Sequence, residues 1–200
     1  MSMRWTMIGA AALALALAGC GESAPEQAAE GSDRAMQETP NLPADPAGVV
    51  RLRGDGLEVT GPLGTMLTFG SPRETVEAEL ASAMGEARDV GTNAECGAGP
   101  VAFTEYPGGL TLNFQEGALV GWSLRDDDGD GQSADIATAE GIDLASSEAE
   151  LTAAYEVEMI ADSTLGEEFT TPAGIFGFLT GEGAQKEVES LHAGMNCFFR

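Results

Sequence analysis

Three acidic side chains at alternate positions, Asp126, Asp128 and Asp130, have the type and spacing that calcium binding requires. Together with Gly131 they match positions 1, 3, 5 and 6 of a calcium loop, in which carboxylate oxygens ligate the ion. The match then ends, because Ala137 stands at position 12, where a bidentate glutamate is needed. We interpret the run as a solvated linker, with a weak calcium site as the alternative, and we expect no resident cofactor.

Side chains suited to catalysis are few in this sequence. His192 is the only histidine, and its place after Leu191, near the end of an expected strand, is typical of a structural residue. The sequence contains no GxSxG motif, no HExxH motif and no P-loop. Glu167 and Glu168 are adjacent carboxylates, but such pairs arise by chance in a chain with 33 Asp and Glu residues. We therefore expect no enzymatic activity, with a carboxylate-dependent hydrolase as the alternative.

The first twenty residues have the pattern of an export signal. Arg4 precedes an apolar run over residues 5–16, which is too short to span a bilayer but typical of a signal-peptide core. Leu17-Ala18-Gly19-Cys20 then resembles the lipobox of bacterial lipoproteins. The resemblance implies removal of residues 1–19, a thioether-linked diacylglycerol on Cys20, and acylation of the new amino terminus. The alternatives are an ordinary secretory signal and a buried helix with a chance cysteine.

The expected location follows from the same segment. Gly21, where the family's sorting rule places Asp for retention in the inner membrane, favours the outer membrane, with the body of the protein facing the periplasm. No later run of 18 or more apolar residues occurs in the sequence. Lipid on Cys20 is therefore the expected contact with the membrane.

The two other cysteines, Cys96 and Cys197, have no assigned role in the lipid anchor. In the oxidising space outside the cytoplasm, a remaining pair of thiols is expected to form a disulfide. A zinc site is disfavoured, because the sequence has no CxxC motif and only one histidine. We predict a bond that fastens the end of the chain to its middle.

The charge of the chain restricts its partners. With 33 acidic and 9 basic side chains, the formal net charge is −24. Such a chain repels phosphate backbones and anionic lipids, so we expect no binding to nucleic acid. The charge suits a basic protein partner or divalent cations, and it also keeps an exported domain soluble.

The segment after the lipidated cysteine, residues 20–48, is rich in Pro, Ala and acidic residues and has almost no large apolar side chain. We expect a flexible tether that holds a folded domain away from the membrane. Beyond it we predict an α+β body. The body consists of a first repeat at 49–126, an acidic linker at 127–140 and a second repeat at 141–200.

The first repeat begins with short strands and a helix. Residues 49–60 predict a hairpin around a Gly-Asp-Gly turn, and residues 65–69 predict a further strand. Ser71 as N-cap and Pro72 as the first helical residue mark the start of a helix, which Gly85 ends.

Three strand candidates follow at 101–106, 110–115 and 118–124, joined by glycine-containing turns. They predict an antiparallel meander, with one face covered by the helix. Strict alternation places Leu119 on the opposite face of the last strand from Trp122, and we expect Trp122 to be a core residue.

The second half starts with a similar pattern. Residues 142–146 match residues 67–71 in the placement of apolar and small side chains. Ser147 and Glu150 offer a capping box for a second helix, and a last strand is expected at 188–193. We infer two tandem units, each with one helix followed by an antiparallel sheet.

This arrangement resembles the two-repeat architecture of the β-lactamase-inhibitor proteins and its single-repeat relatives, the SmpA/OmlA-like outer-membrane assembly lipoproteins. The segments behind the resemblance are residues 69–72 with the helix that follows, 109–114, 119–122, and 141–155. The family's Gly-Met-Thr turn is absent, and Phe-Gly-Ser-Pro stands in its place. The resemblance implies a fold and a non-catalytic binding or adaptor module for a protein or envelope component. It carries over no contact residue.

Overall fold

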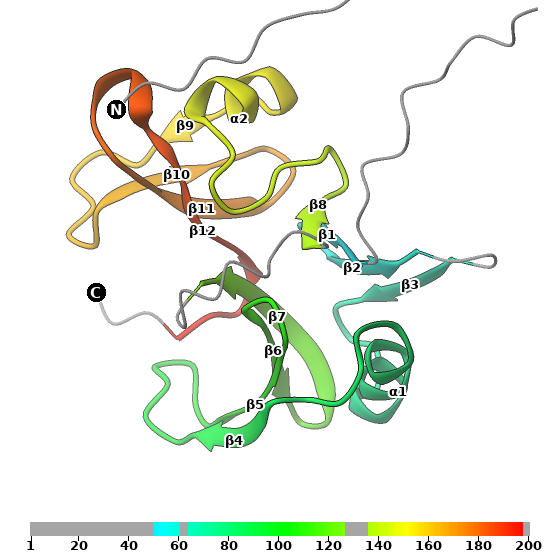
Figure 1. Cartoon of the computed structure of the whole chain (residues 1–200). Coiled ribbons are helices and arrows are strands. Elements are labelled where there is room, and N and C mark those ends of the chain that lie inside the picture. Colours follow the sequence, from blue (N-terminus) through cyan, green and yellow to red (C-terminus); the bar gives the residue numbers. More distant parts are fainter. Residues whose placement is uncertain (1–49, 61–63, 127–135, 198–200) are drawn as a thin grey trace, which may run out of the picture. The chain divides into compact units, whose positions relative to one another are not determined.

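The computed structural model describes residues 50–60, 64–126 and 136–197. These residues form an α+β structure that is dominated by antiparallel sheets (Figure 1). The predicted signal peptide, Cys20 and the tether lie outside the described residues. The elements, in chain order, are β1 (Val50–Arg53), β2 (Gly56–Val59), β3 (Thr65–Thr68), α1 (Arg73–Met84), β4 (Asp89–Asn93), β5 (Val101–Tyr106), β6 (Leu110–Gln115), β7 (Ala118–Arg125), β8 (Ile136–Thr138), α2 (Glu148–Ala154), β9 (Glu158–Met159), β10 (Glu167–Thr170), β11 (Ile175–Thr180) and β12 (Glu187–Gly194).

The described strands form two sheets. The smaller sheet has the order β3-β2-β1-β8, and the larger has the order β4-β5-β6-β7-β12-β11-β10-β9. At the centre of the larger sheet, β7 pairs antiparallel with β12, the last described strand of the chain. The two outermost strands of this sheet, β4 and β9, each pair with one described neighbour.

Most of the predicted strands are present. The 49–60 hairpin is confirmed, with Gly54 and Asp55 as its two-residue turn, and the meander of β5, β6 and β7 has the predicted bounds to within one residue. Glu116 and Gly117 join β6 to β7 with φ of 53° and 78°, as a tight primed turn requires. The strands β4, β9 and β10 were not predicted, because β4 and β10 each contain few apolar side chains and β9 is only two residues long.

Strand β8 lies within the stretch that the sequence assigns to the acidic linker, 127–140. Its three residues are buried, and β8 pairs in parallel with β1 along Val50, Arg51 and Leu52. Parallel pairing joins segments that are far apart in the chain, so no turn motif in the local sequence predicts the pairing of β8 with β1. The first sheet therefore includes a strand from beyond the predicted boundary.

The faces of β7 differ from the prediction. The register between β6 and β7 slips after Asn113, so that Val120 becomes an extra residue in a bulge. Because a bulge reverses the alternation, Leu119 and Trp122 lie on the same covered face, and both side chains are fully buried. The prediction that they lie on opposite faces is wrong, whereas the prediction that Trp122 is a core residue is confirmed. Its indole N–H donates to the carbonyl of Arg53, at 2.8 Å.

The two helices begin differently. The capping box of α2 is confirmed, since the Ser147 hydroxyl accepts from Glu150 N–H and the Glu150 carboxylate accepts from Ser147 N–H. Ser71 does not cap α1. Its carbonyl accepts instead from Leu119 N–H of β7, and the helix starts after Pro72 without a side-chain cap. The Ser71 carbonyl is engaged by the sheet, so Ser71 does not take the N-cap position, in which its carbonyl would accept the first hydrogen bond of the helix.

One face of the larger sheet is covered by α1, α2 and the smaller sheet, and the main core lies between them (Figure 1). Val76 and Leu80 of α1 and Leu151 of α2 point into this core, together with the buried side chains of β6, β7, β11 and β12. Leucine and aromatic side chains of this size stabilise the fold by about 1.5–3 kcal/mol each when fully buried. Within the described segments, neither helix is long and apolar enough to cross a bilayer.

Candidate functional site

The structure brings Cys96 and Cys197 together, as the predicted pairing requires. Cys96 belongs to the loop between β4 and β5, and Cys197 follows β12. The two sulfur atoms are at bonding distance, and the Cα atoms are 5.1 Å apart. The segment that leads to Cys197 crosses the first half of the larger sheet, where Met195 N–H donates to the Val120 carbonyl and the Asn113 amide donates to the Met195 carbonyl. The segment before Cys197 is therefore fastened to the larger sheet both by hydrogen bonds and by the cysteine pair.

The candidate calcium ligands are described only in part. Asp126 is an exposed residue directly after β7, whereas Asp128 and Asp130 lie outside the described residues. Within the described ranges, no group of three or more His, Cys, Asp or Glu side chains is arranged to hold a metal ion. The weak calcium site remains a sequence-based prediction.

The face of the larger sheet opposite to the helices carries an aromatic row. His192 of β12 is 6% exposed, and its ring stacks on Phe176 and Phe178 of β11, with ring centroids 5.6 and 5.9 Å apart. Beside this row, the buried carboxylate of Glu168 accepts a hydrogen bond from the Ser163 hydroxyl at 2.8 Å. The adjacent Glu167 is not part of this arrangement, since its carboxylate pairs with Lys186 at 2.7 Å. The two carboxylates therefore have separate, structural environments.

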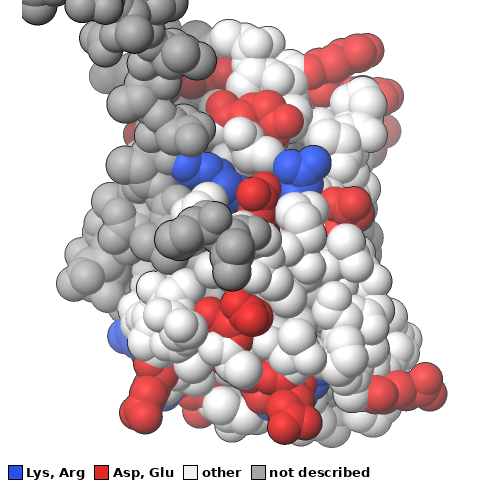
Figure 2. Space-filling model, turned by 90° about the vertical axis from the view of Figure 1, so that its right-hand side faces the viewer, with Lys and Arg blue, Asp and Glu red and all other residues white. Residues whose placement is uncertain are grey.

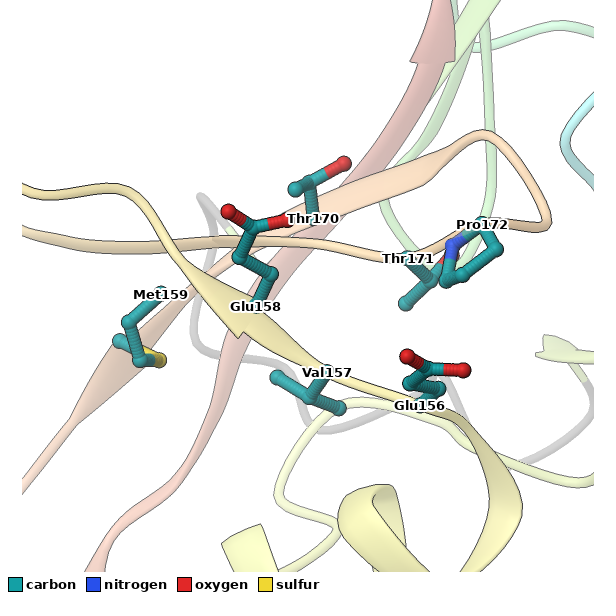
Figure 3. A pocket seen from close by; sticks show the side chains of 7 residues that line it. All are labelled: Glu156, Val157, Glu158, Met159, Thr170, Thr171 and Pro172. Atoms are coloured by element: carbon teal, nitrogen blue, oxygen red, sulfur yellow. The ribbon is translucent and has the colours of Figure 1, made fainter.

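A hollow of about 590 Å³ lies at the outer edge of the larger sheet, beside β9. We call it the edge hollow. Its floor and walls come from the segment before and through β9 and from the turn between β10 and β11, as Figure 3 shows. The lining residues are Glu156, Val157, Glu158, Met159, Thr170, Thr171 and Pro172.

Local interactions hold both sides of the edge hollow. On one side, Tyr155 caps α2 through its N–H to Leu151, and its hydroxyl donates to Glu140. Burial, together with this carboxylate, raises the pKa of Tyr155 well above its usual range, so the hydroxyl stays a donor. On the other side, Thr171 closes the turn by hydrogen bonds between its hydroxyl and both backbone groups of Ile175.

The edge hollow offers acidic and apolar groups together. Glu156 and Glu158 are exposed, and Figure 3 shows Glu156 pointing toward Pro172 and Glu158 toward the side of Thr170. Met159 is one of the large apolar side chains that is exposed, at 43%. Glu158 shares its face of the sheet with Thr170, and Met159 shares the opposite face with Phe169, so the carboxylate and the apolar side chain lie on opposite faces of β9. Sequence reasoning missed the edge hollow, although residues 156–159 alternate acidic and apolar side chains in the way an edge strand does.

A second, smaller hollow of about 240 Å³ lies on the face of the sheet opposite to the helices, next to the segment before Cys197. It is lined mainly by polar side chains of β5, β6 and β7, with Phe103 as its aromatic member. The Gln and Asn side chains nearby are occupied with holding loops: Asn113 contacts Asn196, and Gln115 donates to the Ala98 carbonyl. These polar side chains therefore hold the segment before Cys197 and the loop before β5 in place.

Acidic side chains are spread widely over the surface. Figure 2 shows one face on which red acidic groups lie at several separate places, while blue basic groups are fewer, with the most prominent ones above the middle. With a formal net charge of −24, the field of the whole molecule favours cations over anions near its surface.

Comparison with protein-family models, with curated proteins and with solved structures finds no match to this chain.

Proposed function

We propose that this protein is an exported lipoprotein, anchored by acyl chains on Cys20, whose α+β body binds a protein or another envelope component without catalysis. The observation that carries the proposal is Leu17-Ala18-Gly19-Cys20 placed directly after an apolar run of signal-peptide length. The Cys96–Cys197 pair at bonding distance supports export, because disulfides persist in oxidising compartments. The location that we propose is the outer membrane, with the body facing the periplasm.

We also propose that the body consists of two copies of one structural unit. Support comes from the turn before each helix. Gly70 N–H donates to the Leu119 carbonyl at 2.8 Å, and Ala145 N–H donates to the Val188 carbonyl at 2.9 Å. Gly70 and Ala145 both have positive φ, at 97° and 66°, and they occupy the same place in the sequence match between 67–71 and 142–146. A non-glycine residue in this conformation is uncommon, which makes the correspondence informative.

The sheet gives further support for two units. The strand order β4-β5-β6-β7 is mirrored by β9-β10-β11-β12 around the central β7–β12 pair. A register slip occurs between Asn113 and Phe114 of β6 and again between Phe178 and Leu179 of β11. Bulges are specific features rather than random defects, so their matched placement favours duplication. The proposed relationship to the β-lactamase-inhibitor-like and SmpA/OmlA-like proteins concerns this architecture.

The arrangement of carboxylates favours binding over the hydrolase alternative. Acid–base hydrolysis by two carboxylates requires that both face the same reacting bond. Glu156 and Glu158, the two carboxylates of the edge hollow, point to different sides of it in Figure 3. They are better placed to contact two positions of an extended ligand than one reacting atom.

The lipid anchor is tested by fractionation of cells that express the intact chain. We expect the wild-type protein in the membrane fraction and the Cys20→Ala variant in the soluble periplasmic fraction, because acyl chains supply the anchor. Ser23→Ala is the matched control and should stay in the membrane. Membrane association of exported Cys20→Ala protein would contradict the proposal. Mass spectrometry of the first tryptic peptide should detect the diacylglycerol and the acyl group.

The binding role is tested by chemical cross-linking in intact cells, followed by mass spectrometry of the captured complexes. We expect the same cross-linked partner with the wild-type protein in repeated preparations, and its loss when the body after residue 49 is replaced by an unrelated periplasmic domain. If the partner is retained on the exchanged body, binding belongs to the anchor and the tether, and the proposed role of the α+β body is wrong.

A further inference from the structure

Strand β9 is an open edge of the eight-stranded sheet. It pairs with β10 on one side, and no described strand pairs with its other side. Ile160 N–H donates to the Glu168 carbonyl at 2.8 Å, so the alternate residue, Met159, directs its backbone N–H and C=O away from β10. Met159 therefore offers one donor and one acceptor to an additional strand.

The edge hollow lies at the start of β9, between the segment that leads into this strand and the turn after β10. In strand addition, backbone hydrogen bonds supply affinity, and pockets for alternate side chains supply specificity. Glu158 shares one face of the sheet with Thr170, whereas Met159 shares the other face with Phe169. An added strand therefore meets a carboxylate on one face of β9 and an apolar side chain on the other. A segment that alternates Lys or Arg with an apolar residue matches this arrangement.

The opposite edge of the same sheet, β4, is less suited to a cationic partner. It is longer, and Val90 is 57% exposed, but this edge carries charges of both signs, because the exposed Asp89 at its start directly follows Arg88. At β9 the two exposed charged residues that line the edge hollow, Glu156 and Glu158, are both acidic. Charge complementarity therefore selects β9 rather than β4 for a basic ligand.

We propose that β9 is the docking edge for an extended, basic segment of a partner protein. The segment adds to the larger sheet as a further antiparallel strand, hydrogen-bonded to Met159, and it places a Lys or Arg side chain beside Glu158, on the opposite face of the sheet from Met159. This proposal rests on the proposed binding function and names the surface and the partner's chemistry.

The test uses the full chain as the lipid-free Cys20→Ala protein and a short fluorescent peptide of alternating Lys and Val. We expect saturable binding in fluorescence anisotropy. Met159→Pro removes the outward N–H without removing a bond to β10, and it should weaken binding about tenfold, the equivalent of one or two hydrogen bonds. Glu156→Gln with Glu158→Gln should weaken binding and reduce its dependence on salt.

The matched control is Val90→Pro on the opposite edge, which should leave binding unchanged. A second probe, the same peptide with N-methyl groups on alternate backbone nitrogens, keeps the charge but cannot pair as a strand, so it should bind at least about tenfold more weakly. This probe needs no change in the protein and keeps the test valid if Met159→Pro is poorly folded. In amide NMR spectra, the lysine peptide should shift the Met159 signal.

Three results would overturn the proposal: no binding of the lysine peptide, equal binding of the N-methylated peptide, or equal loss with Val90→Pro and Met159→Pro. Equal binding of the N-methylated peptide would mean that general charge attraction alone holds the peptide. These results leave the fractionation and cross-linking outcomes unaffected, so failure of the docking edge is distinct from failure of the proposed function.

Discussion

Thr104 of β5 donates a hydrogen bond to Glu77 of α1 at 2.6 Å, across the interface between the helix and the larger sheet. Arg73, one turn earlier in α1, donates to the same carboxylate oxygen at 2.8 Å and to the Thr104 hydroxyl at 3.1 Å. The guanidinium of Arg73 also lies 4.9 Å from the ring centre of Phe114. This network orients α1 on the sheet in place of the missing side-chain cap.

The network predicts a loss of stability in acid. Burial raises the pKa of Glu77, but hydrogen bonds from Thr104 and Arg73 outweigh it and hold the pKa below the ordinary value of 4.5. Because the pKa of Glu77 is lower in the folded than in the unfolded state, its contribution to stability is complete above about pH 4.5. The contribution is lost as the pH falls through the pKa of the folded state. Glu77→Gln should cost about 1 kcal/mol at pH 6, since the pair is partly exposed.

The measurement is urea unfolding of wild type and variant between pH 6 and pH 3. The difference in unfolding free energy should shrink toward low pH, and Thr104→Val should show a smaller version of the same trend. Glu74→Gln, an exposed position on the same helix outside the network, is the control. A difference that stays constant with pH would show that Glu77 acts through its shape rather than its charge.

The cysteine pair predicts sensitivity to reduction. Cys96 and Cys197 are 101 positions apart in the chain, and closing so long a loop stabilises a fold by up to about 4.7 kcal/mol in the chain-entropy model. Reduction should lower the thermal midpoint and expose the segment after β12 to protease. Cys96→Ala with Cys197→Ala should match the reduced wild type. Two free thiols in the non-reduced periplasmic protein, detected by mass spectrometry, would contradict the pairing.

Gly121 in β7 predicts a steric requirement. A Cβ at this position would collide with the backbone oxygen of Met195 and lie 2.7 Å from its nitrogen. Since these are backbone atoms, Gly121→Ala must displace the segment that leads to Cys197, and we expect a loss of about 1–3 kcal/mol in urea unfolding. Gly97→Ala, beside Cys96, meets no atom within 4 Å and should change stability by less than about 0.5 kcal/mol.

The acidic run predicts a weak response to calcium. The glutamate that closes a calcium loop is absent at Ala137, so Ca²⁺ at low millimolar concentration should raise the thermal midpoint by at most a few degrees. Differential scanning calorimetry with Ca²⁺ and with a chelator measures this shift. A large stabilisation that disappears in Asp128→Ala would replace the linker interpretation with a true calcium site.

Much of the local structure could be predicted from the sequence. The turn at Gly54 and Asp55, the primed turn at Glu116 and Gly117, and the capping box that starts at Ser147 are all present. Each depends on residues within a few positions of one another, and the backbone preferences of glycine or a hydroxyl cap are sufficient to define it. The candidate cysteine pair was also predictable, because export leaves only one pairing.

Only the tertiary structure decided how these pieces combine. The bulge at Val120 turns Leu119 toward the core, and it exists because β6 and β12 both pair with β7 in a register that no local pattern specifies. Ser71, a good N-cap by type, pairs with the sheet instead. The edge hollow at Met159 likewise arises where strand pairing stops, and where a sheet ends is set by contacts between segments far apart in the chain.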